Sequence, residues 1–198
     1  MRTPTVFVAA LIWAVLVVAA VHFLDFPGSV PNFQQASSGG ALLDAVPAFT
    51  ADSIYQRLDA YGHEGRKNYS FRNVTVDVLL PLSALPFLFL LMLRAVTAVP
   101  VGRSWRATLL SVPLVYVIFD LVENSIVLVL LSSYPERINA LAMTLPSVTI
   151  IKRIASLLAI GVPLMMLGFR IFSQVPETKA PPHWEGGLTY GRWCSGES

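Results

Sequence analysis

The chain has 198 residues, of which 55% are hydrophobic and 13% are charged, and its formal net charge is +2 at pH 7. A soluble domain carries about 25% charged residues, so the composition indicates one compact membrane domain rather than a soluble core with an anchor. The small, dispersed charge argues against nucleic acid as a partner. One cysteine, Cys194, excludes an internal disulfide, CxxC redox chemistry and a cysteine metal site, and the sequence implies no cofactor.

The first apolar run covers residues 5–24 and follows a single positive residue, Arg2. It is long enough to cross a membrane, since about 20 apolar residues span a hydrocarbon core of roughly 30 Å. Ala10 and Ala14 add a small-residue face of the kind that brings helices together. The alternative is a cleavable signal peptide that ends near Ala20. We expect a retained helix.

The polar segment 25–73 contains one stretch, residues 50–61, that predicts a short amphipathic helix. Thr50 is a suitable N-cap, and Gly62 is a suitable C-terminal stop. The apolar side chains of this stretch fall on one helix face and comprise Ile54, Tyr55, Leu58 and Tyr61. We expect this face to pack on the outer ends of the membrane-spanning helices.

Three further apolar runs predict membrane-spanning helices over residues 74–93, 107–131 and 148–172. Pro81 and Pro86 should kink the second span and free backbone carbonyl groups. The predicted fold class is all-α, a four-helix transmembrane bundle over residues 1–172 with a short amphipathic helix in the first outer loop. Residues 173–198 are rich in proline, glycine and charge, which predicts a disordered cytoplasmic tail.

The orientation in the membrane follows from the arginines. The connection between the second and third spans carries Arg94, Arg103 and Arg106 and no acidic residue. Positive residues collect in short cytoplasmic loops. We therefore expect this connection, the N-terminus and the C-terminus to be cytoplasmic.

Ionisable residues inside the apolar runs are the main candidates for function. Asp120, Glu123 and Asn124 share one helix face in the third span, because residues three and four apart are neighbours. Asp77 in the second span and Lys152 in the fourth are expected in the same outer half of the bundle. A charged residue within a span costs about 2.5–3.5 kcal/mol on insertion scales, so such residues face the protein interior and have partners.

Two interpretations of this cluster stay open. In the first, Lys152, together with Arg153, neutralises Glu123 and Asp77 and fixes the helix register; the protein is then non-enzymatic and binds membrane lipid, a lipid-like ligand or a protein partner. In the second, the cluster is a ligand or ion site that is open to the outer side. The alternative function is that of a membrane enzyme or proton-coupled carrier for a small or lipid-like molecule, which uses Asp120 and Glu123. A cavity that reaches Glu123 would favour the second function.

The outer segment before the second span contains the motif YGxxGRxxY, formed by Tyr61, Gly62, Gly65, Arg66 and Tyr69. Asp77 and Pro81 follow it, and then come the DxxEN motif of residues 120–124 and Lys152. In this order, over residues 50–172, the motifs resemble a family of small four-span membrane proteins of unknown function. The resemblance implies a membrane bundle and no particular activity. In architecture alone, the chain is similar to relatives of the emopamil-binding sterol isomerase, bundles whose acidic residues face an internal lipid pocket.

Overall fold

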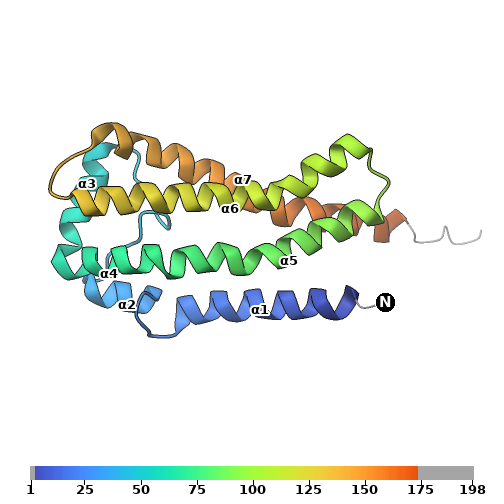
Figure 1. The fold of residues 1–198 in the computed structure, drawn as a ribbon, viewed down its shortest axis with the longest axis horizontal. Coiled ribbons are helices and arrows are strands. Elements are labelled where there is room, and N and C mark those ends of the chain that lie inside the picture. Colours follow the sequence, from blue (N-terminus) through green and yellow to red (C-terminus); the bar gives the residue numbers. More distant parts are fainter. Residues whose placement is uncertain (1–2, 174–198) are drawn as a thin grey trace, which may run out of the picture.

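The computed structural model describes residues 3–173, and within them the chain forms helices and no strand. Four long helices form a bundle: α1 (Thr3–Phe23), α5 (Val76–Ala98), α6 (Arg103–Ser133) and α7 (Asn139–Ser173). Three short helices lie at one end of it (Figure 1): α2 (Val30–Ala36), α3 (Ala51–Ala60) and α4 (Gly62–Val74). The predicted all-α bundle is confirmed, whereas the predicted disordered tail, from residue 174 onward, lies outside the described residues.

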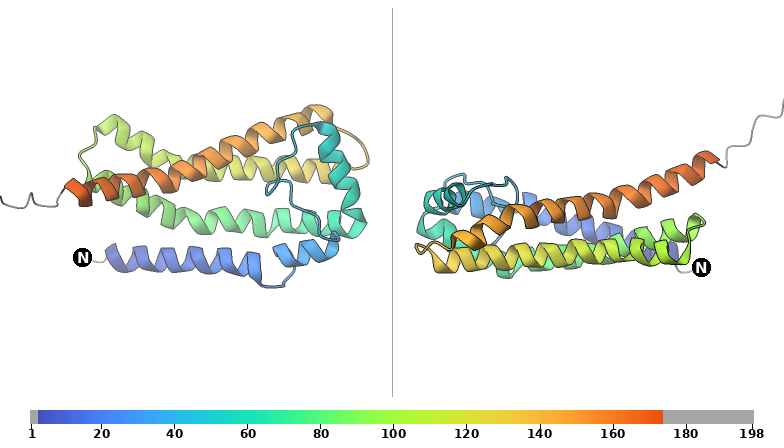
Figure 2. Two further views of the ribbon diagram at one scale, coloured as in Figure 1. Left: turned by 180° about the vertical axis from the view of Figure 1, so that it is seen from behind. Right: turned by 90° about the horizontal axis from the view of Figure 1, so that it is seen from above.

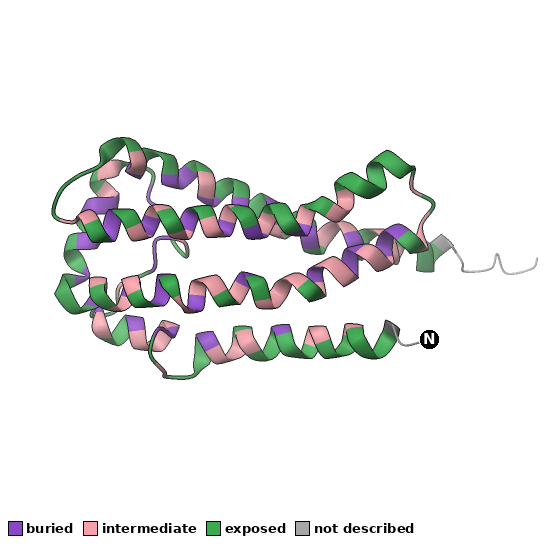
Figure 3. Cartoon of the chain, viewed as in Figure 1, coloured by how far each residue is buried: buried purple, intermediate pink, exposed green. Residues whose placement is uncertain are grey.

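Four stretches are long and apolar enough to cross a membrane: Pro4–Phe23, Gly62–Ala98, Arg103–Ser133 and Asn139–Phe172. Large apolar side chains such as Leu79, Leu157 and Phe169 remain exposed on the outer faces of the bundle. Figure 3 shows exposed positions along the outward sides of the long helices and buried ones toward their neighbours. Exposed apolar surface of this extent is typical of contact with a membrane.

The long helices alternate in direction. Both described ends of the chain and the α5–α6 connection lie at one end of the bundle, opposite α2, α3 and α4 (Figures 1 and 2). Helix α6 packs against α7, and α5 packs against both, whereas α1 packs mainly along α5. In α1 only 11% of the apolar segment is buried, against 33% in α6. Helix α1 is therefore the peripheral member of the bundle.

The short amphipathic helix α3 forms where the sequence predicts it. Thr50 Oγ1 accepts a hydrogen bond from Ser53 N at 3.2 Å, which caps the helix. The predicted apolar face is buried, and Ile54 and Leu58 have no exposed surface. These side chains join a core that includes residues near the C-terminal end of α6 and the N-terminal end of α7: Val127, Leu130, Leu131, Ala142 and Leu145. The predicted packing of α3 on the ends of the bundle is confirmed.

Helices α2 and α4 lie in the segment that the sequence assigns to a polar loop. Helix α2 begins after Ser29, whose Oγ accepts a hydrogen bond from Asn32 N at 3.2 Å, and it carries Pro31 in its first turn. Helix α4 is polar along most of its length and packs against α2, α5 and α6. Such a helix is stabilised mainly by its tertiary contacts, and an apolar period does not reveal it.

The cytoplasmic position of both termini is a prediction that reporter fusions can check. We expect fusions after Leu93 and after Phe172 to report the cytoplasm, because the connection rich in arginine stays on that side. A fusion after Ser132 should report the opposite side. If the fusions after Leu93 and Ser132 reported the same side, α6 would not cross the membrane.

Candidate functional site

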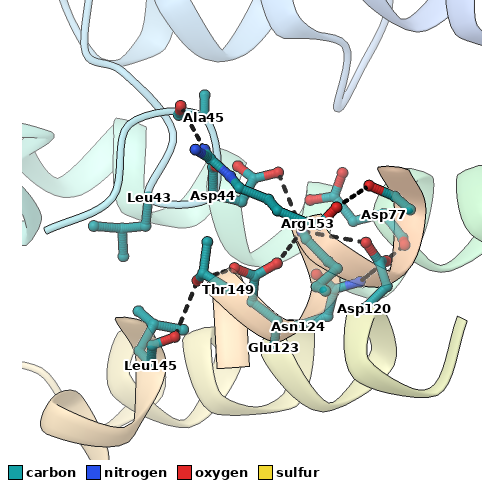
Figure 4. Close-up of polar contacts among 12 residues, drawn as sticks. Leu43, Asp44, Ala45, Asp77, Asp120, Glu123, Asn124, Leu145, Thr149 and Arg153 are labelled. Atoms are coloured by element: carbon teal, nitrogen blue, oxygen red, sulfur yellow. Dashed lines mark hydrogen bonds and ion pairs between the residues drawn. The ribbon is translucent and has the colours of Figure 1, made fainter. Parts of the chain in front are cut away.

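Three polar or charged side chains project from one face of α6 toward α5 and α7. Asp120, Glu123 and Asn124 are three and four positions apart, so the helix places them side by side. Asp120 and Glu123 are buried and Asn124 is half-buried. Lys152 of α7 contacts Glu123 and Asp120, and the backbone carbonyl of Asp77 in α5 accepts a hydrogen bond from Asn124. Figure 4 shows Asp77 beside Asp120, Glu123 and Asn124. The structure therefore brings together all five residues that the sequence singled out in the spans.

The centre of this ionic cluster is the pair between Glu123 and Lys152. The Lys152 ammonium donates a hydrogen bond to Glu123 Oε2, and the Thr149 hydroxyl donates one to Oε1. Glu123 is only 1% exposed, so both of its carboxylate oxygens are satisfied by protein groups. The contact joins α6 to α7 and supports the interpretation in which Lys152 neutralises Glu123.

Asp120 and Asn124 extend the cluster from α7 to α5. Asp120 Oδ1 lies 3.3 Å from Lys152 Nζ, and Asp120 Oδ2 accepts a hydrogen bond from Asn124 Nδ2 at 3.2 Å. The Asn124 amide also donates to the backbone carbonyl of Asp77 at 2.8 Å. This carbonyl has no helical partner, because the residue four positions later is Pro81, which lacks an N–H. The carbonyl that proline frees thus becomes an acceptor that ties α5 to α6.

Asp77 pairs with Arg72, which the sequence interpretation did not include. Arg72 Nη2 lies 2.8 Å from Asp77 Oδ1, and Arg72 Nη1 donates to the Gly28 carbonyl at 2.8 Å. Arg153 follows Lys152 directly and therefore points about 100° away around the helix; it donates to backbone carbonyls of the loop before α3. The prediction that Lys152 and Arg153 neutralise Asp77 is therefore wrong, because the cation paired with Asp77 is Arg72.

The motif YGxxGRxxY forms a cap at the end of the bundle. Gly62 has φ +64° and turns the chain from α3 into α4, a conformation that glycine adopts without strain. Gly65 lets α4 approach the end of α2, since a Cβ there would lie 3.0 Å from Ser37. The Arg66 guanidinium lies over the Tyr134 ring, 4.1 Å from its centroid. These three members of the motif have packing roles.

Tyr61 and Tyr69 fix the loop that precedes α3. Their rings pack against Phe33, with centroid distances of 5.2 and 5.1 Å. The Tyr61 hydroxyl donates to the Ala41 carbonyl, and the Tyr69 hydroxyl accepts a hydrogen bond from Leu43 N at 3.2 Å. Burial raises the pKa of Tyr61 to about 12, so its hydroxyl keeps the proton that it donates at neutral pH. The motif thus positions the loop beside the ionic cluster.

A cavity of about 380 Å³ lies against the ionic cluster, and we call it the charged cavity. Its charged side chains are Asp44, Arg72, Asp77, Asp120 and Lys152. The loop before α3 also lines it, through Leu42 and Ala45. Glu123 does not belong to its lining. The part of the cluster that can meet a bound molecule therefore contains Asp77, Asp120 and Lys152, and Glu123 lies behind it.

A second cavity, of about 480 Å³, is lined almost entirely by apolar side chains, and we call it the apolar cavity. Its wall comes from α1, α5, α6 and α7 and includes Leu11, Ala14, Val18, Ala19, Ala84, Phe87 and Ile160. Leu80, Tyr116 and Ser156 line both cavities. A charged space and an apolar space thus adjoin in the bundle.

Tyr116 lies at the boundary between the two cavities. Its apolar surroundings in the sequence predict a core position, but it is half-buried and lines both spaces. Its hydroxyl makes no hydrogen bond with any residue of the range 3–173, whereas the Ser156 hydroxyl donates to the Arg153 carbonyl at 2.8 Å. Tyr116 is therefore the group at this boundary that is available to a ligand.

Comparisons with protein-family models, with curated proteins and with solved structures find no match to the chain. The functional conclusion accordingly depends on the geometry of the ionic cluster and its surroundings. The candidate site consists of the charged cavity, the apolar cavity and the three side chains that line both.

Proposed function

We propose that the chain is a multi-pass membrane protein that binds a lipid-like molecule in the two adjoining cavities. The observation that carries this proposal is the wall they share, formed by Leu80, Tyr116 and Ser156. A polar head group would lie in the charged cavity, and an apolar tail would lie in the apolar cavity. Ligand sites are typically apolar with a few polar groups that fix the orientation of the ligand, and this pair of cavities has that composition.

The positions of the two cavities support access from the bilayer. On the outer side the charged cavity is covered by the loop before α3, where Arg153 donates to the carbonyls of Asp44 and Ala45 at 2.6 and 2.9 Å. The apolar cavity has α1 on one side and α7 on another, and α1 packs mainly along α5. A lipid-like molecule would therefore reach the cavities between α1 and α7.

The two interpretations of the sequence apply to different residues of the cluster. Glu123 and Lys152 join α6 to α7, and Glu123 has no surface in the charged cavity. Asp77 and Asp120 line that cavity and would contact the head group. In this proposal both termini are cytoplasmic, and the head group lies in the outer half of the bilayer. The chain would also be related to the small four-span proteins of unknown function that its motifs resemble.

A second function, acid–base chemistry or proton-coupled transport of the bound molecule, is favoured by one observation. Asp120 and Lys152 form an ion pair of 3.3 Å and both line the charged cavity, so a molecule bound there would lie beside a carboxylate and an ammonium group that can exchange protons with it. Glu123, the other residue expected to take part in this chemistry, is buried and paired with Lys152. This role would therefore fall to Asp120 rather than to the pair of carboxylates.

Photolabelling of the purified chain with a photoactivatable fatty alcohol tests the proposed site. We expect the label on residues that line the apolar cavity. Ala19→Trp fills that cavity and should reduce labelling about tenfold, which corresponds to about 1.4 kcal/mol of binding free energy. Ala9→Trp is the matched control, since Ala9 is exposed on the same helix and does not line the cavity. Labelling spread over all lipid-facing helices, and equal in both variants, would contradict the proposal.

A further inference from the structure

Tyr116 lies where the charged cavity and the apolar cavity meet, because its side chain lines both of them. Among residues 3–173 no group accepts a hydrogen bond from its hydroxyl. Ser156 also lines both cavities, but its hydroxyl already donates to the Arg153 carbonyl at 2.8 Å. Tyr116 therefore carries the polar side-chain hydrogen that a ligand at this boundary can use.

The position of Tyr116 makes an unpaired hydroxyl unfavourable. The residue belongs to α6, whose stretch Arg103–Ser133 is long and apolar enough to cross a membrane. A hydroxyl that is removed from water without a compensating hydrogen bond raises the free energy of the protein, and the hydrocarbon region of a bilayer contains no water that could supply one. An oxygen atom of the bound molecule would satisfy this hydroxyl.

Arg72 has a second side-chain donor without an acceptor on the wall of the charged cavity. Its Nε is buried and makes no hydrogen bond within the described part of the chain, whereas its Nη atoms bind Asp77 and the Gly28 carbonyl. Because Nε is enclosed by the protein, the Tyr116 hydroxyl is the donor that a molecule in the cavity can reach. Both unsatisfied groups are donors, so the wall is complementary to a head group that accepts hydrogen bonds.

Every aspartate, lysine and arginine on this wall already has an oppositely charged partner. The Lys152 ammonium lies 3.3 Å from Asp120 and 3.9 Å from Asp44, so it takes the place between these two carboxylates. Arg72 Nη2 lies 2.8 Å from Asp77 Oδ1. A charged head group of either sign would compete with one member of these pairs for its partner. An uncharged oxygen would leave the pairs intact.

We propose that the lipid-like ligand has an uncharged head with a hydroxyl, ether or ester oxygen, and that the Tyr116 hydroxyl donates a hydrogen bond to this oxygen. This inference rests on the proposed function, because it names the chemical class of the molecule in the same two cavities. The oxygen lies at the boundary between the cavities, and the hydrocarbon tail continues past Leu80 into the apolar cavity. Tyr116 is then the residue that selects the head group.

Competition with the photoactivatable fatty alcohol, on the full chain in phosphatidylcholine nanodiscs, measures this selectivity. The competitors are dodecanol, dodecyl methyl ether and dodecane, compared at equal mole fraction in the bilayer. We expect dodecanol to displace the label at about a fivefold lower mole fraction than dodecane, the effect of one hydrogen bond. The ether should compete as well as dodecanol, because it keeps the acceptor oxygen and lacks only the hydroxyl hydrogen.

Tyr116→Phe should abolish the preference for dodecanol and the ether over dodecane. The substitution keeps the ring and removes a hydroxyl that makes no hydrogen bond within residues 3–173, so the fold should tolerate it. Tyr134→Phe is the matched control, because it removes a hydroxyl from the connection between α6 and α7, outside the lining of either cavity. The preference should survive this second substitution.

Equal displacement by dodecanol and dodecane, or an ether that competes no better than dodecane, would overturn the acceptor oxygen. A preference that Tyr116→Phe leaves unchanged would overturn the role of Tyr116. Better competition by dodecylamine or dodecyl phosphate than by dodecanol would overturn the uncharged head. Each of these results leaves the proposed lipid site intact, whereas a label that ignores every competitor and also Ala19→Trp would overturn both proposals.

Discussion

Lys152→Met is expected to destabilise the folded chain by about 3–5 kcal/mol, the usual effect of removing one partner from a buried ion pair. The Lys152 ammonium donates to Glu123, and it lies 3.3 Å from Asp120 and 3.9 Å from Asp44. Without it, Glu123 would be a carboxylate with 1% exposure and the Thr149 hydroxyl as its remaining donor. Thermal unfolding of the purified chain in one detergent measures the loss of stability.

Adding Glu123→Gln to Lys152→Met should restore much of that stability. Glutamine has nearly the shape of glutamate, and its carbonyl oxygen can still accept the hydrogen bond of Thr149. No ionised group then stays behind the cavity wall, while Asp120 keeps Asn124 as a donor at 3.2 Å. If the losses of the two single variants were additive in the double variant, Glu123 and Lys152 would not be a pair, and the assigned contact between α6 and α7 would be wrong.

Arg153→Met is the matched control for Lys152→Met. Arg153 is the neighbouring cation on α7, but it is exposed and donates to the carbonyls of Asp44 and Ala45. Losing a hydrogen bond from a charged group typically costs about 1.5–3 kcal/mol, and solvent at this exposed position should bring the cost to the lower end. An equal loss in both variants would indicate a general effect of removing positive charge from α7.

The bundle and its ionic cluster could be predicted because both depend on local spacing. An apolar run of about 20 residues determines a membrane-spanning helix, and the spacing of Asp120, Glu123 and Asn124 determines a shared face. Alternating helix directions then place Lys152 near Glu123. The cap of α3 at Thr50 and the turn at Gly62 follow from residue chemistry that acts within four positions.

The partner of Asp77 could not be predicted because it depends on a helix without an apolar period. Residues of α4 look like a polar loop in the sequence, and Arg72 falls within this polar segment, before the predicted second span. In the structure α4 continues toward α5, and Arg72 is buried at 3% exposure. The available signal was the arginine five positions before the aspartate, a spacing that also occurs on unpaired surface residues.

The two cavities could not be predicted from the sequence either. They depend on how α1 packs along α5 and on how the loop before α3 covers the ionic cluster. Tyr116 has the apolar neighbours of a core residue in the sequence, and only the arrangement of four helices shows that it lines two spaces. The cavity reaches Asp120 and not Glu123, a distinction of one helical turn that periodicity cannot make.

Arg72→Met is expected to destabilise the chain by about 3–5 kcal/mol, again because one partner of a buried pair is removed. Arg72 is 3% exposed, and the Asp77 side chain is 13% exposed. The variant also leaves the Gly28 carbonyl without its donor at 2.8 Å. Thermal unfolding in the same detergent measures the effect, and Lys67→Met, at an exposed position of the same helix, is the control.

Combining Arg72→Met with Asp77→Asn should recover only part of the loss. The double variant removes the unpaired carboxylate, but the Gly28 carbonyl stays without a donor, and a buried unsatisfied polar group costs about 1–3 kcal/mol. The unrecovered part therefore measures the contact between α4 and the segment after α1. If Arg72→Met proved no more destabilising than Lys67→Met, the Asp77 carboxylate would not depend on Arg72, and the assigned junction between α4 and α5 would be wrong.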